Sequence, residues 1–328
     1  MPRIFITRAI PNRALKVLTD VFGSGSVDVY EEDRIIPREV LLERVKGADA
    51  VLTMLTEYWD EEVFESAGST LKILANCAVG YNNIKVDAAT ARGVAVSNTP
   101  DVLTESTADL AWALILGACR RVGEAERYLR AGKWDSWSPN FMLGNDVHGG
   151  TLGIFGMGRI GRATARRAAG FNMRVIYHSR TRIEADVETE LNARYVPFLD
   201  LLAESDVISI HCPFTSETRH AFGADQFRAM KSTATLVNIS RGPVVDEAAL
   251  AQALLSGEIA FAGLDVFEKE PKIHSDLLTC ENAMLLPHIG SATLETRTQM
   301  AELAARNIVA RLTDAPLPTC VNPETITD

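Results

Sequence analysis

Short β-branched runs alternate with helical segments along nearly the whole chain, and this alternation restricts the fold more than any other feature. Such alternation predicts parallel sheets with helices on both faces. Pro11 and Pro37 precede two of the amphipathic segments, as proline often does at a helix start. We therefore predict an α/β fold of doubly wound parallel sheets. The expected strands are Arg3–Thr7, Val27–Tyr30, Ala50–Met54, Leu71–Ala75, Val94–Ser97, Thr151–Phe155, Arg174–His178, Asp206–His211, Ala234–Ile239, Ala260–Val266 and Met284–Leu286.

Breaks at Pro100 and Pro287 divide this series of strands and helices. A chain of 328 residues has room for two domains at about 100–200 residues each. We therefore expect an inner domain at residues 100–288. The outer domain would consist of residues 1–99 and 289–328, with a cleft between the two domains.

The charge and the cysteine pattern argue against several classes of protein. With 33 basic and 43 acidic residues the formal net charge is −10, so nucleic acid and anionic membrane surfaces are poor partners. No apolar run approaches the roughly 18 residues of a membrane-spanning helix. The five cysteines are scattered and lack C-x-x-C spacing, which favours reduced thiols over disulfides or a zinc site. We therefore expect a cytoplasmic protein that binds no nucleic acid, membrane or metal.

A glycine pattern, G-x-G-x-x-G, stands at Gly156, Gly158 and Gly161. A strand is expected before it and an uninterrupted helix after it, which is the context that a dinucleotide site requires. The first glycine permits a tight turn, the second lets backbone N–H groups approach a pyrophosphate, and the third allows close packing of helix and strand. The pattern therefore predicts that residues 100–288 bind a dinucleotide. The alternative is a glycine-rich turn without a ligand.

The residues expected beside the adenosine ribose follow the next strand. A site for NAD carries Asp or Glu here to bind the ribose 2′-hydroxyl, but this strand ends in hydroxyl groups and arginines, with Glu184 the nearest carboxylate. Arginine binds phosphate through charge-assisted, often bidentate hydrogen bonds. We therefore predict NADP(H) as the preferred cofactor, with NAD(H) possible; the alternative is that the arginines are solvated surface charges. The predicted contacts are Ser179, Arg180, Thr181 and Arg182.

Three polar residues, Arg241, Glu270 and His288, each follow a different expected strand. The carboxyl ends of the strands of a doubly wound sheet face one crevice, so these side chains are expected to converge. Reduction of a ketone by a nicotinamide leaves an oxygen that needs a proton, which a histidine can deliver. A glutamate would orient that histidine, and an arginine can bind a carboxylate and polarise the adjacent carbonyl. Singly, each residue could equally be an ordinary core, loop or surface group.

Six stretches carry a more specific pattern: Ala78–Asp87, Asn98–Thr104, Gly153–Gly161, Val237–Gly242, Gly263–Pro271 and Pro287–Ala292. In their order and content they resemble the D-isomer-specific 2-hydroxyacid dehydrogenases, and within that family the glyoxylate/hydroxypyruvate reductases. The spacing of Arg241, Glu270 and His288 also agrees with that family's Arg, Glu and His. The resemblance implies a Rossmann cofactor domain and a flavodoxin-like substrate domain.

The resemblance also implies roles for residues that no motif identifies alone. Val79 and Gly80 would offer backbone N–H groups to the substrate carboxylate, and Asp265 would hold the nicotinamide amide. The implied cofactor contacts beyond the glycine motif and the ribose residues are Thr104, Arg159, Ile160, Cys212, Pro213, Ile239, Ser240, Asp265 and Gly290. The implied substrate contacts are Leu55, Val79, Gly80, Trp137, Arg241 and His288.

The resemblance further implies a homodimer joined through the cofactor domains, with the loop around Trp134 and Trp137 as its dimerisation arm. Trp137 would either reach the partner's active site or pack only within the interface. Tyr58 and Trp59 depart from the family pattern. They would either shape the substrate pocket or pack against the helix that follows.

The prediction from these features is an NADPH-dependent reductase that converts small 2-oxo acids, such as glyoxylate and hydroxypyruvate, into D-2-hydroxy acids. Arg241 would bind the substrate, His288 would act as general acid, and Glu270 would orient His288. Two alternatives stay open. One is an enzyme of the phosphoglycerate dehydrogenase type, and the other is a dinucleotide-sensing corepressor or scaffold on the same fold.

Overall fold

The structure is a computed structural model that describes residues 1–326. The chain divides into two compact units, one of Met1–Leu103 with Ser291–Asp328 and the other of Thr104–Gly290. The sequence predicted these divisions after residues 99 and 288. Among the described residues, no helix has both the length and the apolar character that crossing a bilayer demands.

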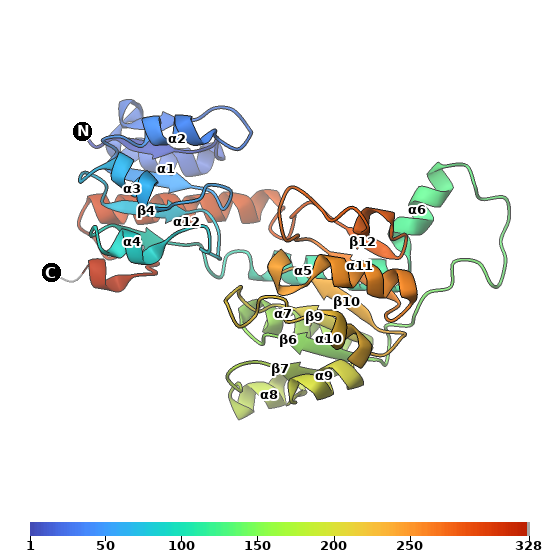
Figure 1. Ribbon diagram of the computed structural model, residues 1–328. Helices are drawn as coiled ribbons and strands as arrows, with labels where there is room; N and C mark the ends of the chain where they lie inside the picture. The colour runs from blue at the N-terminus through green and yellow to red at the C-terminus, as the bar shows by residue number, and fades with distance from the viewer. Residues whose placement is uncertain (327–328) are drawn as a thin grey trace. The chain divides into compact units, whose positions relative to one another are not determined.

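The first unit is built around five parallel strands in the order β2-β1-β3-β4-β5 (Figure 1). This is the flavodoxin-like strand order. All residues of β1, β3, β4 and β5 are buried, as expected for a parallel sheet covered on both faces. The strands are β1 Ile4–Ile6, β2 Val27–Val29, β3 Ala50–Thr53, β4 Ile73–Asn76 and β5 Ala95–Ser97. The helices are α1 Asn12–Phe22, α2 Arg38–Arg44, α3 Glu61–Ala67, α4 Val86–Thr90 and α12 Leu294–Leu312, with 3₁₀ turns at Ser24–Ser26 and Pro323–Thr325.

The C-terminal helix α12 completes the core of this first unit. It packs against α1, β3 and β4. Ala304 and Ile308, one turn apart, are fully buried beside Ile4 and Leu18. The last long helix of the chain therefore belongs to the same unit as the first strand.

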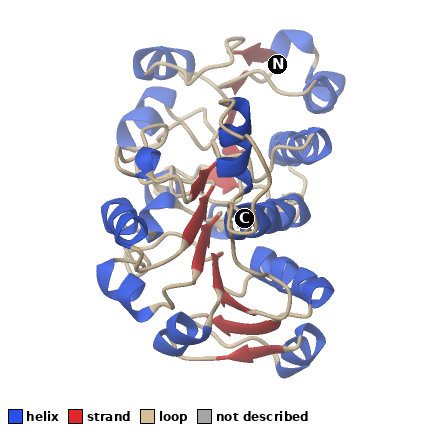
Figure 2. Ribbon diagram, turned by 90° about the vertical axis from the view of Figure 1, so that its right-hand side faces the viewer, coloured by secondary structure: helices blue, strands red, loops and turns tan. Residues whose placement is uncertain are grey.

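The second unit holds seven parallel strands in the order β12-β11-β10-β9-β6-β7-β8. Figure 2 shows helices on both sides of the strands. The strands are β6 Thr151–Phe155, β7 Arg174–His178, β8 Ala193–Tyr195, β9 Val207–Ile210, β10 Thr235–Asn238, β11 Phe261–Leu264 and β12 Ala283–Leu285. The helices are α5 Thr104–Cys119, α6 Val122–Arg130, α7 Arg159–Ala168, α8 Ala185–Leu191, α9 Phe198–Glu204, α10 Ala224–Ala229 and α11 Glu247–Ser256, with 3₁₀ turns at Ala169–Phe171, Gly242–Val244 and Leu277–Thr279.

The strand order of the second unit reverses beside β6. The chain runs from β6 outward through β7 and β8 and then crosses to β9 on the other side of β6. Such a reversal opens a crevice at the carboxyl ends of the strands, where ligands bind in open α/β sheets. The residues that follow β6, β7 and β9 to β12 therefore lie at the edge of the sheet where this fold binds its ligands.

The predicted α/β fold with two doubly wound parallel sheets is confirmed. β6 and β7 have the predicted bounds. β4 begins at Ile73 and ends at Asn76, later than the predicted Leu71–Ala75. β8 was not predicted, because its three residues, Ala193–Tyr195, form a partly exposed edge strand without an apolar run.

Candidate active site

Two of the three motif glycines lie where no other residue fits, and the third faces open space. Gly156 has a φ of 100°, and a Cβ there would lie 2.6 Å from the backbone nitrogen of Cys212. A Cβ on Gly161 would overlap the carbonyl oxygen of Gly156. A Cβ on Gly158 would meet no atom within 4 Å. The first and last glycines therefore fold the loop tightly, and room remains beside the middle one.

That room lies at the start of α7, where a helix presents unpaired N–H groups and the positive end of its dipole. Gly158 is the N-cap of α7, and no side chain caps the helix. Arg159 and Ile160 are its first two residues. An uncapped helix start, open space and the reversal of strand order together fit the pyrophosphate of a dinucleotide.

The tip of β7 carries the residues predicted to read the adenosine ribose. Ser179 Oγ accepts a hydrogen bond from the Met157 N–H at 2.7 Å, which ties this tip to the glycine loop. Arg182 forms two hydrogen bonds with the carboxylate of Glu188, at 2.9 and 2.7 Å. These bonds help to lower the pKa of Glu188 to about 2. Arg182 therefore already has an anionic partner. Arg180 is exposed and forms no close ion pair with a carboxylate among the described residues, although its charge helps to lower the pKa of Glu217.

His288 and Glu270 form a hydrogen-bonded pair after β11 and β12. His288 Nδ1 lies 2.7 Å from Glu270 Oε2. Because a carboxylate only accepts, Nδ1 donates and Nε2 is left for a substrate. Glu270 Oε1 accepts from the Phe267 N–H at 3.0 Å. Burial acts to raise the pKa of Glu270, but the contacts with His288 and Phe267 and the charge of Arg241 outweigh it and leave this pKa below its usual value.

The backbone around His288 is held in an uncommon conformation. His288 has a φ of 54°, in the left-handed region that side chains other than glycine rarely adopt. Asp265, which is fully buried, accepts from the Ile289 N–H at 2.7 Å and from the Gly290 N–H at 2.8 Å. Burial raises the pKa of Asp265. Asp265 thus fixes the turn that presents the imidazole; its predicted contact with the nicotinamide amide stays a prediction.

Arg241 lies on a turn after β10 that Asn238 holds in place. Asn238 Nδ2 donates to the Arg241 carbonyl at 3.0 Å, and Asn238 Oδ1 accepts from the N–H and the hydroxyl of Ser240. Burial lowers the pKa of Arg241, and the charge of Glu270 opposes that effect. Asn238 was not identified from the sequence, although it lies inside the stretch Val237–Gly242 that carried the resemblance. The sequence feature that could have identified it is an asparagine at the end of an apolar strand, directly before the Arg241 turn.

The turn of Arg241 rests directly on the Phe267–Glu268 peptide, in the loop that carries Glu270. A Cβ on Gly242 would overlap the carbonyl carbon and oxygen of Phe267. No relaxation of a flexible side chain could relieve this overlap, since the atoms belong to the backbone. The close approach therefore brings the Arg241 turn and the Glu270 loop together.

We expect Gly242→Ala to lower the free energy of unfolding by about 3 kcal/mol or more, because a buried backbone contact must separate. Denaturant unfolding measures the effect. Gly170→Ala is the matched control in the same unit, since a Cβ there meets nothing within 4 Å. Equal unfolding midpoints for the two variants would contradict this account of the contact.

The first unit carries the predicted substrate contacts Val79 and Gly80 in a loop after β4. Asn98 Nδ2 donates to the Val79 carbonyl at 2.8 Å, and Asn76 Nδ2 donates to the Gly80 carbonyl at 2.9 Å. The two N–H groups bond to no other group among the described residues. Two asparagine amides therefore hold the carbonyls and leave a pair of donors available. Leu55, which follows β3, is 38% exposed.

Tyr58 and Trp59 have opposite environments. Tyr58 is 50% exposed, whereas Trp59 is fully buried, packs against Phe64 and donates from its indole N–H to Thr53 Oγ1 at 2.8 Å. Glu57, also buried, accepts from the Met54 N–H at 2.7 Å. Trp59 is therefore a core residue of the first unit, and of the two aromatics only Tyr58 is exposed.

The segment predicted as a dimerisation arm is unusually exposed. Helix α6 has no buried residue, and Figure 1 shows it and the following loop standing away from the sheet of the second unit. Trp134 is 54% exposed and Trp137 is 79% exposed. Large apolar side chains this exposed are typical of a surface that another molecule covers.

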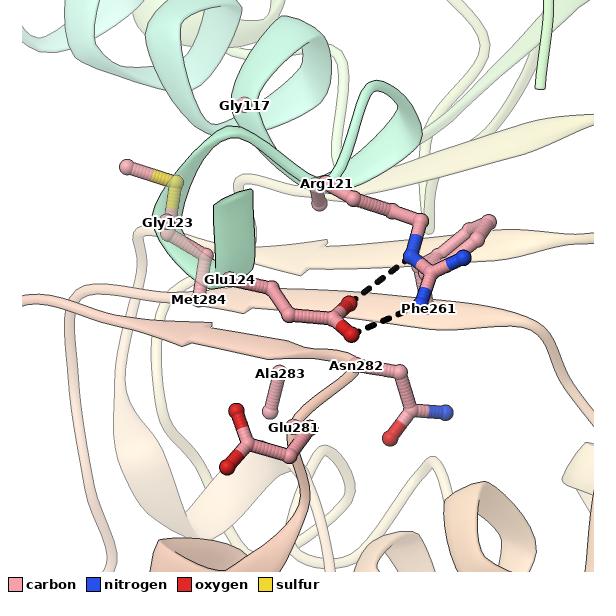
Figure 3. Close-up of a pocket in the computed structure, with 10 residues that line it drawn as sticks. Gly117, Arg121, Gly123, Glu124, Phe261, Glu281, Asn282, Ala283 and Met284 are labelled. Carbon is pink, nitrogen blue, oxygen red and sulfur yellow. Dashed lines mark hydrogen bonds and ion pairs between the residues drawn. The ribbon is translucent and has the colours of Figure 1, made fainter. Parts of the chain in front are cut away.

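Figure 3 shows a pocket between the end of α5, the start of α6 and β12. Arg121 and Glu124 form an ion pair across it with two hydrogen bonds of 2.7 Å. Met284 lies beside Gly117 at its wall. The lining contains none of the predicted site residues, so this pocket is separate from the candidate active site.

Apart from Trp137 on the exposed segment after α6, the second unit thus gathers its predicted site residues at the carboxyl ends of its strands or at the starts of its helices. His288 and Glu270 are in contact, and the turn of Arg241 adjoins their loop. The remaining predicted cofactor residues of this unit follow the same edge of the sheet or lie at the start of a helix. They are Thr104 at the start of α5, Cys212 and Pro213 after β9, Ile239 and Ser240 after β10, and Gly290 after β12.

Comparisons with known proteins agree with this geometry. Residues 112–290 match the family described as "D-isomer specific 2-hydroxyacid dehydrogenase, NAD binding domain". The chain is 51% identical to a glyoxylate reductase of Pyrococcus horikoshii over 329 aligned residues, which cover 99% of this chain and 97% of that protein. It is 52% identical to a glyoxylate reductase of Korarchaeum cryptofilum over 327 residues, covering 99% and 97%.

Solved structures give the same result. A glyoxylate reductase from Paecilomyes thermophila superposes with a TM-score of 0.87 at 36% identity, covering 98% of each chain. An NADPH-dependent glyoxylate/hydroxypyruvate reductase from Sinorhizobium meliloti, in complex with NADP and malonate, superposes with a TM-score of 0.82 at 34% identity, covering 99% of this chain and 97% of that one.

Proposed function

Since this chain belongs to the D-isomer specific 2-hydroxyacid dehydrogenase family, and is therefore an NAD(P)-dependent oxidoreductase, we propose that it reduces glyoxylate and hydroxypyruvate with NADPH. The products are the 2-hydroxy acids, with the D configuration where the product is chiral. The observation that carries the proposal is the His288–Glu270 pair with the partly buried Arg241 on the adjoining turn. The names of the relatives support the choice of substrate.

In this proposal each side chain has one task. Arg241 binds the substrate carboxylate and polarises the neighbouring carbonyl. His288 Nε2 donates a proton to the carbonyl oxygen, while Glu270 holds Nδ1 and stabilises the charged imidazole. The bound nicotinamide supplies the hydride for the carbonyl carbon.

The first unit contributes its unpaired donors. In this proposal the N–H groups of Val79 and Gly80 would bind the substrate carboxylate, and Leu55 would contact the substrate. The support is that Asn98 and Asn76 already occupy the two carbonyls of this loop. Tyr58, 50% exposed in the segment that follows Leu55, would contact the substrate from the same side.

The experiment that tests the proposed function is consumption of NADPH by the purified protein with a panel of 2-oxo acids. We expect turnover with glyoxylate and hydroxypyruvate, and D-glycerate as the product of the latter. A protein that binds NADPH but turns over no 2-oxo acid would support a dinucleotide-sensing role instead. Turnover with a phosphorylated 2-oxo acid alone would indicate an enzyme of the phosphoglycerate dehydrogenase type.

The preference for NADPH gives a separate prediction about two arginines. Arg180 is exposed at the tip of β7, whereas Arg182 is engaged by Glu188. We expect Arg180→Ala to weaken NADPH binding about tenfold, the loss of roughly one charge-assisted bond, and to leave NADH binding unchanged. Arg182→Ala is the matched control and should change the ratio of the two affinities less. Titration of each variant with both reduced cofactors measures this.

An unchanged affinity ratio in both variants would mean that the 2′-phosphate is bound elsewhere. A larger effect of Arg182→Ala than of Arg180→Ala would mean that the Arg182–Glu188 pair opens when the cofactor binds. Either result would show that Arg180 is not the main residue that binds the 2′-phosphate.

We also propose a homodimer joined through the second units. The support is the exposure of Trp134 and Trp137 on the segment that follows α6. Trp137 then either contributes to the partner's pocket or packs within the interface. A cytoplasmic location is proposed because all five cysteines are free thiols.

A further inference from the structure

Two carboxylates outside the catalytic pair, Glu247 and Glu268, hold each other's backbone. Glu268 Oε1 accepts from the Glu247 N–H at 3.0 Å, and Glu247 Oε1 accepts from the Glu268 N–H in return. Glu247 Oε2 accepts from the His274 N–H at 2.9 Å. His220 Nε2 donates to the second oxygen of Glu268 at 2.9 Å. These bonds connect the start of α11 to the loop between β11 and β12.

Glu270 lies between the two residues of this loop that donate hydrogen bonds to Glu247. The donors are the N–H groups of Glu268 and His274, which stand on either side of Glu270 in the sequence. Glu270 in turn bonds His288. A chain of direct hydrogen bonds and one short loop therefore connects Glu247 with the imidazole.

Capping of α11 does not account for Glu247. Asp246 is the N-cap of that helix, and its side chain accepts from the Ala249 N–H at 3.0 Å. Glu247 is only 5% exposed and pairs with no lysine or arginine among the described residues. Burial of a carboxylate is costly unless hydrogen bonds compensate. Here both oxygens are used to hold the loop of Glu270.

We propose that Glu247 is a positioning residue that fixes the loop of Glu270 and so sets how firmly the His288–Glu270 pair holds the proton delivered in the reduction. The proposal rests on the proposed function for its kinetic consequence. It adds a buried residue that touches neither substrate nor cofactor. Removal of Glu247 loosens both ends of the loop, and Glu270 then supports the charged imidazole less well.

The test compares Glu247→Ala and Glu247→Gln with Glu258→Gln, a control just past the other end of α11. The glutamine variant keeps the side-chain volume but only one acceptor, so it remains informative if the alanine variant does not fold. Deuterium exchange of the backbone amides of residues 268–270 and 272–274 reports the loop directly (Pro271 has no amide hydrogen). The pH dependence of kcat/KM for glyoxylate reduction reports the pair.

We expect faster exchange of these amides in both Glu247 variants and not in Glu258→Gln. The alkaline limb of the pH profile, where the pair loses the proton that it must donate, should move to lower pH by about half a unit to one unit. Activity should therefore recover as the pH is lowered, while the Kd for NADPH stays within about twofold. A merely structural defect would lower the activity equally at every pH.

Two results would overturn the proposal: unchanged exchange of residues 268–274, or an alkaline limb that coincides with that of the wild type. If the wild-type protein shows no turnover with any 2-oxo acid, the proposed function fails. The exchange measurement still decides whether Glu247 holds the loop, so the two failures are distinguishable.

Discussion

We expect His288→Ala to lower kcat for glyoxylate reduction by about 10³–10⁴-fold, the range that loss of a well-placed general acid produces. The reason is geometric. Glu270 accepts from Nδ1, and Asp265 fixes the turn just beyond His288 with two backbone hydrogen bonds. The imidazole is therefore held with Nε2 available before any substrate arrives. Stopped-flow measurement of NADPH consumption gives the rate.

The control for this prediction is cofactor binding. His288→Ala should bind NADPH with nearly unchanged affinity, because the glycine loop and the tip of β7 lie on other strands. Near-normal turnover in the variant would show that His288 is not the general acid. A variant that no longer binds NADPH would show that the substitution disturbs more than proton transfer.

Glu270 adds a pH dependence whose sign follows from its lowered pKa. A carboxyl group with a depressed pKa in the folded state contributes stability that is present above its unfolded pKa, at about pH 4.3. That contribution is lost as the pH falls from there through the lowered value. The carboxyl group of Glu270 therefore remains ionised throughout the neutral pH range.

Much of the site could be predicted because its residues lie where the fold forces them together. In a parallel doubly wound sheet, the residue after each strand reaches the same edge, so Arg241, Glu270 and His288 could be combined without coordinates. The three glycines were predictable for the same reason, since strand, loop and helix follow one another directly. The strand order seen in the structure then determines which strand ends lie next to each other.

Other features depend on side-chain partners that no motif records. Glu188 lies on α8, and its pairing with Arg182 depends on how that helix packs against β8 and α7. Trp59 and Tyr58 are adjacent in the sequence, yet only one of them packs into the core. Glu247 binds backbone N–H groups, and any residue can supply such a group, so the sequence carries no sign of the partner.

Arg241→Ala is expected to raise the KM for glyoxylate about 30–100-fold and to lower kcat about 10²-fold, the size of effect seen when a charged donor to a reacting oxygen is removed. The guanidinium is partly buried and lies within the electrostatic influence of Glu270, and burial lowers its pKa, so a further anionic group beside it stabilises its charged form. A substrate carboxylate provides that anion in the geometry of a bidentate pair.

Arg241→Lys separates charge from shape. Lysine keeps the positive charge but lacks the planar fork, so we expect a KM between those of the wild type and the alanine variant. Asn238 still holds the turn through the residue's carbonyl in both variants, and thermal melting should therefore move little. An unchanged KM in Arg241→Ala would show that Arg241 does not bind the substrate. An equal increase of the KM in both variants would show that the planar guanidinium, and not the positive charge alone, binds the carboxylate.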